Sequence, residues 1–561
     1  MGRLLSRRAV AQGSIAALAA CASPGAGGAD LLIHGGPIYT GNPAQPRVEA
    51  VRVRDGVFVF AGALADARAS GHGVREIDLG GAAAFPGFTD SHVHLTYVGM
   101  AAMVLDLVGV ESIAALQRRL ADYARAHPSG PIIGRGWIET HWPERRFPTR
   151  GDLDGIVGDR PVFLERIDGH AAVVNSAALA LAGIDASTPD PDGGRIERDA
   201  SGAATGMLID NAAALAQSRF PSPTDAQRRE ALRQAARIYA ARGWTGVHNM
   251  STSGDEHIDF LDLDGAGDMP LSANLYLAPP QRYVDAARTW ETMRARGAFE
   301  SARVRVRGYK LYMDGALGSR GAALLAPYSD ASGDGLLVTP PDELRLMLSH
   351  AREYGVQVAT HAIGDRGNRL VLDAYRDAFA NSPTALRAAR WRIEHAQVIA
   401  REDLPRFAEL GVIASMQPSH AISDLHFAPA RLGPDRLAGA YAWRSLLASG
   451  AVVCAGSDAP VEKGDPLIEF YAATYRHDLS GFAGPDWRGE EAVSRAQALH
   501  MLTTAPAFAS FSEAERGTIE PGKRADLSAF SVDLMEAAPM DIPTARAVLT
   551  VSGGRITHQA L

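Results

Sequence analysis

Two histidines separated by one residue, His92 and His94, follow an apolar run at residues 82–88. On an extended strand, side chains two positions apart point to the same side. Two imidazoles that project together from the end of a strand could supply half of a metal site. A pair of hydrogen-bonded surface histidines has the same spacing, so this motif alone leaves both interpretations open.

Other side chains that could do chemistry stand at the ends of strand-like segments, namely Lys310, His361, His395 and Asp458. Their segments are residues 304–311, 356–360, 391–394 and 452–457. Each has a simpler interpretation as a core, paired or helix-capping side chain; Lys310, for example, could pair with Asp314. With the two histidines, however, these residues follow one another over successive strand ends, which favours one shared site.

The elements that would position these residues alternate between strands and helices. Helical patterns at residues 342–353 and 368–379 lie between strand-like segments, and this alternation predicts a (β/α)8 barrel with its site at the carboxyl ends of the strands. An open doubly wound sheet is the alternative, but the chain lacks a glycine-rich dinucleotide turn. The eight predicted strands are residues 83–88, 246–250, 271–277, 304–311, 356–360, 391–394, 411–416 and 451–455.

Both ends of the chain carry alternating, strand-like patterns with turn signals, such as Asp55-Gly56 and the run at 552–554. We therefore expect residues 29–84 and 515–561 to form one small composite β-sandwich. The barrel then occupies residues 85–514. It includes an inserted subdomain at about 101–220, because that span is too long for a single crossover.

The composition is that of an ordinary globular protein of 561 residues, with 46% hydrophobic residues and a formal net charge of −8. This charge and the lack of a basic stripe argue against nucleic acid as a partner. The only cysteines are Cys21 and Cys454. Two cysteines cannot build a disulfide framework or a thiolate zinc site.

The first 28 residues are expected to be a signal peptide and tether. Arginines precede a short apolar run at 9–20, which ends in Leu18-Ala19-Ala20-Cys21 and resembles a bacterial lipobox. Ser6-Arg7-Arg8 also resembles the start of a twin-arginine export signal. We expect an exported bacterial protein, periplasmic or membrane-anchored, with Cys21 as the lipidation site. The alternative is an ordinary secretory signal in which Cys21 is incidental.

Taken together, the motifs resemble the amidohydrolase superfamily, in its Amidohydrolase_3 or YtcJ-like branch. The resemblance covers nearly all of the chain after the signal peptide. Its most specific segments are FPGFTDSHVH at 85–94, GYKLYMDGALGSR at 308–320, THAIGDRGN at 360–368, RIEHA at 392–396, GSDAP at 456–460 and GTIEPGKRAD at 517–526.

The resemblance implies a divalent metal centre of one or two ions per subunit. His92, His94 and Asp458 would hold the more buried metal, and His361 and His395 would hold the second. Lys310 would bridge them as a carbamate, because an ammonium group could not face two cations; the alternative is a single metal beside an ordinary lysine. Zinc is the expected metal, although the same ligands suit iron, manganese or cobalt.

The resemblance also implies hydrolysis of a non-peptide carbon–nitrogen bond in a small amide-type substrate. Metal-bound hydroxide would be the nucleophile, and Asp458 would act as general base and then general acid. A deaminase of the same superfamily needs a glutamate where this chain has Gly364. Hydrolysis of esters, lactones or cyclic amides by the same centre remains open, as does a non-catalytic lipid-anchored binding protein.

Five residues in or near the resembling segments are candidates for substrate binding: Trp137, His170, Arg320, Gln417 and His420. Each has a structural alternative; Arg320, for example, could pair with Asp365. Apart from the small-molecule substrate, the only predicted partner is a membrane, reached through the lipid anchor.

Overall fold

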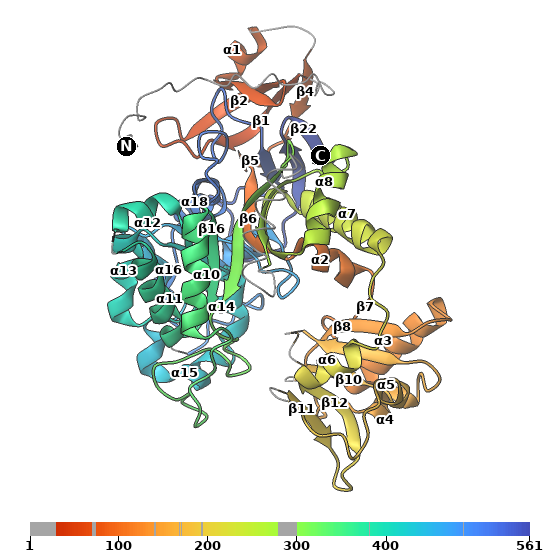
Figure 1. The fold of residues 1–561 in the computed structure, drawn as a ribbon. Coiled ribbons are helices and arrows are strands. Elements are labelled where there is room, and N and C mark those ends of the chain that lie inside the picture. Colours follow the sequence, from red (N-terminus) through yellow and green to blue (C-terminus); the bar gives the residue numbers. More distant parts are fainter. Residues whose placement is uncertain are drawn as a thin grey trace, which may run out of the picture.

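The computed structural model describes residues 30–69, 74–139, 142–167, 169, 171–191, 194–278, 300–380, 382–485 and 487–561 (Figure 1). Eight parallel strands form its central sheet, in the order β19-β18-β17-β16-β15-β14-β13-β6. The sheet closes between its first and last strands, where the Asp458 amide donates to the His92 carbonyl at 2.7 Å and the His94 amide donates to the Ala459 carbonyl at 2.9 Å. The predicted (β/α)8 barrel is thus confirmed.

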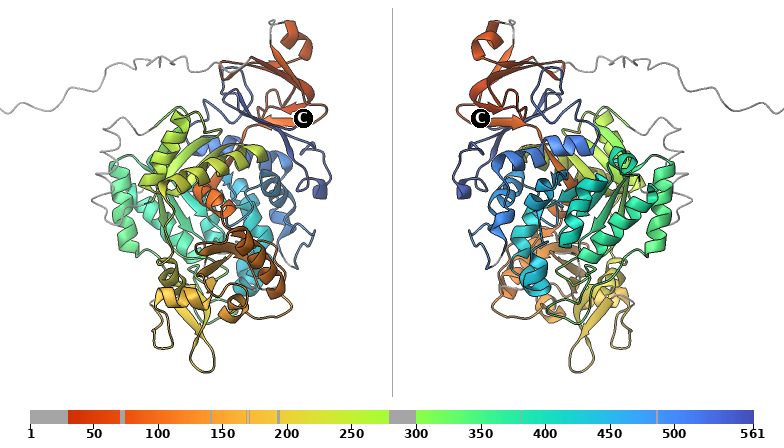
Figure 2. Two further views of the ribbon diagram at one scale, coloured as in Figure 1. Left: turned by 90° about the vertical axis from the view of Figure 1, so that its right-hand side faces the viewer. Right: turned by 90° about the vertical axis from the view of Figure 1, so that its left-hand side faces the viewer.

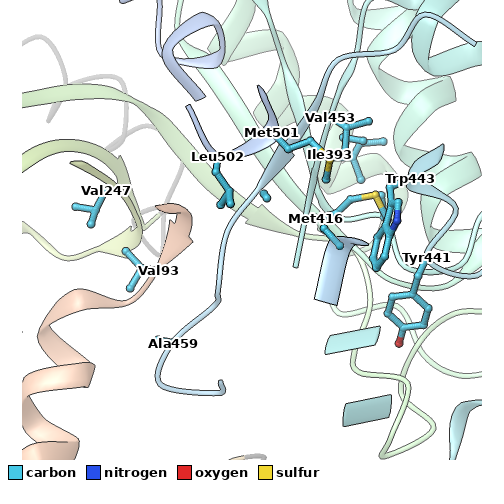
Figure 3. Packing of buried hydrophobic residues seen from close by; sticks show 14 of the residues in the cluster. Val93, Val247, Ile393, Met416, Tyr441, Trp443, Val453, Ala459, Met501 and Leu502 are labelled. Atoms are coloured by element: carbon cyan, nitrogen blue, oxygen red, sulfur yellow. The ribbon is translucent and has the colours of Figure 1, made fainter. Parts of the chain in front are cut away.

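The barrel strands are β6 (Phe88–Val93), β13 (Trp244–Thr252), β14 (Ser272–Leu277), β15 (Val304–Tyr312), β16 (Gln357–Ala362), β17 (Arg392–His395), β18 (Ile413–Met416) and β19 (Val453–Ala455). Alternate side chains point outwards and pack beneath the helices. Ile393 and Val453, for example, belong to the same buried cluster as Met416 and Met501 (Figure 3). The intervening positions face the interior and the site.

Helices cover the outside of the barrel because each presents an apolar stripe to the strands. In α11, Val371, Leu372 and Tyr375 are fully buried. In the described part of the barrel the helices are α2 (Leu95–Ala102), α7 (Asp225–Arg242), α8 (Gly254–Gly265), α10 (Pro341–Glu353), α11 (Asp365–Ala378), α12 (Pro383–Ala389), α13 (Leu404–Leu410), α14 (Pro418–Asp424), α15 (Ala428–Leu437), α16 (Trp443–Ala448), α17 (Pro466–Tyr475), α18 (Arg495–Leu502) and α19 (Thr504–Ala509).

Strands from both ends of the chain share a second sheet at one end of the barrel (Figures 1 and 2). Its order is β22-β21-β20-β5-β1-β2-β3, with β4 beside β1. The elements are β1 (Leu31–Tyr39), β2 (Arg47–Arg54), β3 (Val57–Gly62), α1 (Leu64–Ala69), β4 (Arg75–Asp78), β5 (Ala83–Pro86), β20 (Leu527–Phe530), β21 (Ala547–Ser552) and β22 (Arg555–Gln559).

The first predicted barrel strand, 83–88, is wrong in its bounds. Ala83–Pro86 pairs with β20 in the second sheet, and the barrel strand begins at Phe88. The chain changes sheets at Gly87, where a Cβ atom would lie 2.3 Å from the Thr245 hydroxyl oxygen. One apolar run therefore serves two sheets, and its hydrophobicity pattern does not show the break.

The span between α2 and α7 forms a third sheet, in the order β11-β12-β10-β9-β8-β7. It lies at the opposite end of the barrel from the second sheet (Figure 2). The Arg135 guanidinium donates to the Pro460 carbonyl at 3.3 Å, which ties the insert to the loop after β19. The elements are β7 (Leu105–Asp106), α3 (Ile113–Ala126), β8 (Ile132–Trp137), α4 (Arg150–Asp154), β9 (Val162–Arg166), β10 (Ala171–Val174), α5 (Ser176–Ala182), β11 (Gly194–Arg198), β12 (Ala204–Asp210) and α6 (Asn211–Gln217).

Candidate metal centre

A buried cluster of two imidazoles and one carboxylate lies where the barrel closes. His92, His395 and Asp458 each offer a ligand atom, and these atoms lie within 4.8 Å of one another. His92 Nε2 lies 3.4 Å from Asp458 Oδ1, and His94 Nε2 lies 3.3 Å from the same oxygen. Imidazole nitrogens around a carboxylate are a donor set that divalent metals bind, so these residues fit a metal ion.

Lys310 and His361 complete this cluster from the neighbouring strands β15 and β16. Lys310 Nζ lies 3.4 Å from His92 Nε2. The His361 ring centroid lies 4.5 Å from that of His395. The structure therefore brings all six residues singled out from their strand-end positions to one place.

Burial sets the charge state of these groups. It lowers the pKa of His361 to about 3 and holds the pKa values of His92 and His395 well below their usual range, so the rings are neutral. It also lowers the pKa of Lys310 to about 8. Burial by itself would raise the pKa of Asp458, but His92 and the other nearby histidines lower this pKa by more. The carboxylate is therefore ionised.

Glu394, which sequence reasoning missed, fixes the orientation of His92. Its Oε2 lies 2.6 Å from His92 Nδ1, which leaves His92 Nε2 to face the site. The Arg392 guanidinium donates to both Glu394 oxygens, at 2.8 and 3.1 Å. A carboxylate on the outer nitrogen is the usual support of a metal-binding histidine. Arg392 and Glu394 alternate with apolar Ile393 in a central strand, and that pattern could have revealed them.

The backbone turns two of the six side chains into the site. His395 and Asp458 have left-handed φ angles of 73° and 57°. Strict alternation along β17 would put His395 on the same outer face as Ile393. Left-handed backbone is costly for residues other than glycine and tends to occur at functional sites. Here it places both side chains beside His92.

The model of the amidohydrolase family matches residues 75–558. The chain belongs to the amidohydrolase family. With its candidate metal centre at the carboxyl ends of the barrel strands, it is a hydrolase.

Relatives of this amidohydrolase are similar over nearly their whole length. The putative amidohydrolase YtcJ of Bacillus subtilis is 35% identical, over 94% of this chain and 99% of that protein. An N-substituted formamide deformylase of Arthrobacter pascens is 29% identical, over 94% and 98%. An uncharacterised metal-dependent hydrolase of Pyrococcus furiosus superposes with a TM-score of 0.72 at 29% identity, over 90% of this chain and 100% of that structure.

Two of the predicted substrate-binding residues lie beside the amidohydrolase centre. The Gln417 side-chain oxygen is 2.9 Å from His395 Nδ1, so this residue holds the His395 ring. His420 Nε2 lies 3.7 Å from Asp458 Oδ2. Both residues are buried, and they follow β18 directly.

The structure does not bring Trp137 and Arg320 into the centre. Trp137 is fully buried within the insert, where its indole N–H donates to the Leu164 carbonyl at 2.8 Å. Arg320 is 40% exposed and pairs with Asp330 at 2.9 Å, not with Asp365. Each of these two side chains is thus bonded to a residue close to it in the fold, and neither reaches the centre. His170 and Cys21 lie outside the described residues.

Asp314 does not pair with Lys310. Its carboxylate accepts hydrogen bonds from the backbone amides of Ala323, Ile363 and Gly364, at 2.8 to 2.9 Å. It thereby ties the loop after β15 to the loop that follows His361. The alternative interpretation of Lys310 as half of a local ion pair is therefore wrong.

Proposed function

We propose that this amidohydrolase cleaves a non-peptide carbon–nitrogen bond in a small amide. The observation that carries the proposal is the ionised Asp458 carboxylate, which lies within 3.4 Å of imidazole nitrogens of both His92 and His94. A carboxylate held in that state beside metal-ligand side chains can take a proton from an attacking water. The protonated group can then return the proton to the departing amine nitrogen.

A bound metal and the side chains of the protein would have different roles in the reaction. A divalent metal, when bound, supplies a water of lowered pKa and polarises a carbonyl oxygen. The protein supplies neutral imidazoles in fixed orientations, because burial keeps them unprotonated and Glu394 and Gln417 hold two of the rings. Zinc, as one or two ions, is the metal we propose for this set of ligands.

Lys310 belongs to the same proposal as a carboxylated side chain. Its Nζ faces His92 Nε2 at 3.4 Å, and an ammonium there would repel a metal cation. Reaction of the neutral amine with carbon dioxide would turn it into an anionic oxygen ligand. Protein exchanged into 13C-hydrogencarbonate should show a carbamate signal by 13C NMR, and Lys310→Met should remove it. A wild-type protein without that signal would contradict the carboxylation.

Deamination is disfavoured by the space around Gly364. A Cβ atom there would lie 2.0 Å from the Ala323 carbonyl oxygen, so the backbone leaves no room for the glutamate that a deaminase places at this point. The similarity to an N-substituted formamide deformylase also supports an acyl-type carbon–nitrogen bond. Amide hydrolysis is therefore the reaction we propose.

The proposal is tested by a hydrolysis screen of the metal-replete protein on N-substituted formamides, N-acyl amino acids, aryl amides, esters and lactones. We expect the protein to hydrolyse an amide. A chelator should abolish this activity, and added zinc should restore it. Metal analysis should give one or two equivalents. Hydrolysis of esters or lactones alone would contradict the proposed carbon–nitrogen bond. A folded protein that contains no metal and shows no turnover would contradict the proposal that it is an enzyme.

The role of Asp458 is tested by Asp458→Asn. Asparagine tolerates the left-handed backbone at this position, so the fold should survive. Turnover should be lost, because an amide group cannot accept the proton. Asp342→Asn, at a side chain that is 97% exposed, is the matched control. Retained activity in Asp458→Asn would exclude Asp458 as the base.

We also propose that the protein is exported and anchored in a membrane by a lipid on Cys21. None of the helices in the described part of the chain is long and apolar enough to cross a membrane. Wild-type protein expressed from its full sequence should fractionate with membranes and incorporate labelled palmitate. Cys21→Ser should abolish both. Labelling that persists in the variant would contradict the anchor.

A further inference from the structure

His420, on α14, is a buried histidine with one ring nitrogen left unpaired at the edge of the metal centre. The residue is only 7% exposed. Its Nε2 has no hydrogen-bond partner among the residues that the structure describes. Asp458 Oδ2 lies 3.7 Å from this nitrogen, beyond hydrogen-bond range. A buried, unsatisfied nitrogen is costly unless a ligand completes it.

The contacts on the other side of the ring fix its orientation. The Gln397 amide nitrogen lies 2.9 Å from His420 Nδ1. Gln397 is held in turn by Tyr441, whose amide donates to its carbonyl at 2.6 Å and whose hydroxyl lies 3.4 Å from its side-chain oxygen. The His420 ring also stacks on that of His395, with 11° between the planes and 6.0 Å between the centroids. His420 therefore cannot swing away to find another partner.

These contacts also decide which nitrogen carries the hydrogen. The Gln397 amide nitrogen donates to Nδ1, so Nδ1 is the acceptor and a neutral ring bears its hydrogen on Nε2. Asp458 Oδ2, which lies 3.7 Å from Nε2, is on the side of the ring that this hydrogen faces. Nε2–H is thus a donor without a partner, and it lies on the side of the centre where Asp458 is.

We propose that His420 Nε2–H binds the carbonyl oxygen of the substrate's acyl group and stabilises the negative charge that develops on it. The inference rests on the proposed amide hydrolysis and adds a catalytic residue to that site. His420 gains and loses no proton in this role. The proton moves between water, Asp458 and the amine, and the donor only lowers the energy of the tetrahedral state.

Three substitutions separate the donor from the ring. His420→Gln keeps an amide donor near the Nε2 position, whereas His420→Asn keeps one only near Nδ1, and His420→Ala keeps neither. We expect kcat to fall about 100- to 1000-fold in the Asn and Ala variants, with bound metal unchanged. The Gln variant should retain activity within about tenfold of wild type, as one restored donor predicts. His127→Asn, at an exposed histidine of the insert, is the control.

Two results would overturn the inference while leaving the proposed function intact. If the wild type hydrolyses an amide and His420→Asn does so with the same kcat, His420 does not act as a hydrogen-bond donor in the reaction. Loss of a metal equivalent in the Asn and Ala variants would make His420 a ligand instead. Inactivity of the metal-replete wild type on every substrate of the screen would, by contrast, overturn the proposed function itself.

A second measurement does not depend on activity. In metal-free protein labelled with 15N-histidine, the difference between wild type and His420→Asn isolates the His420 ring. We expect the signature of the Nε2–H tautomer. The Nδ1–H tautomer would overturn the inference, because Nε2 would then have no hydrogen to donate.

Discussion

At the scale of single residues, the centre depends on charged groups that are held in unusual surroundings. Burial lowers the pKa values of His361, His92 and His395, and the pKa of Asp458 is lowered because the neighbouring histidines, by their charge and through a hydrogen bond from His94, outweigh its burial. Behind them, the Arg392–Glu394 pair is fully buried and supports His92. A buried ion pair of this kind contributes little net stability, so its value lies in the orientation that it gives the ligand.

Glu394→Gln tests that support. The glutamine leaves His92 without an anionic partner and Arg392 with an uncompensated charge. We expect metal affinity to fall about 10- to 100-fold and stability to fall by about 3 kcal/mol. Metal competition with a chelator and denaturant unfolding measure the two effects.

The matched control for this substitution is Glu402→Gln. That glutamate is 70% exposed and bonded to Arg369, so neither metal affinity nor stability should change appreciably. Unchanged metal affinity in Glu394→Gln would show that His92 does not need its carboxylate partner.

At the scale of elements, the decisive feature is the close approach of β6 and β19. The loop after β19 lies so near β6 that a Cβ atom on Gly456 would be 2.4 Å from the His92 amide nitrogen and 2.9 Å from Asp90 Oδ1. Asp90 also accepts from the Ser457 amide, at 2.9 Å, and from its hydroxyl, at 2.6 Å. The same contacts close the barrel and bring Asp458 to His92.

Gly456→Ala should therefore damage both the fold and the site. The added methyl must push β19 away from β6, and we expect a loss of about 1–3 kcal/mol in stability together with weaker metal binding. Gly254→Ala is the control, because nothing lies within 4 Å of the Cβ position there. Equal thermal stability of the two variants would contradict the tight contact between the strands.

At the scale of the whole molecule, a buried ion cluster holds the second sheet at the base of the barrel. Asp526, next to β20, accepts from the side chains of Arg516 and Arg524 and from the Gly553 amide. Burial by itself would raise the pKa of Asp526, but the two arginines lower it by more than burial raises it. The pKa of Asp526 is therefore below its usual value. The segment just before β20 is thus fixed against the turn after β21.

This lowered pKa gives the ion cluster a defined pH dependence. A folded-state pKa below the unfolded one stabilises the protein above the unfolded value of about 4. The contribution is lost as the pH falls through the still lower folded pKa. Asp526→Asn should cost about 3–5 kcal/mol at pH 7, and the difference from wild type should shrink below pH 4.

Denaturant unfolding at several pH values measures this effect, with the exposed Asp342→Asn as the control. A difference that stays constant down to pH 2 would exclude Asp526 as the titrating group.

Local sequence patterns were enough to predict the (β/α)8 barrel and to single out six strand-end residues for one site. Strands and helices alternate along the chain, and barrel strands bring their carboxyl ends together, so the positions of His92 and Asp458 favoured a shared site before the family resemblance assigned both to a metal. This worked because each residue's place depends on the strand that it follows, and strand patterns are local.

The groups that support this centre can be identified only in the folded chain. His92 and Glu394 are 302 positions apart, and nothing in either local pattern links them. The inward turn of His395 depends on a left-handed backbone that strand alternation does not predict. Trp137 found its partner within the insert instead of the centre. Contacts between segments far apart in the chain determine these outcomes, and residue patterns within one segment do not record them.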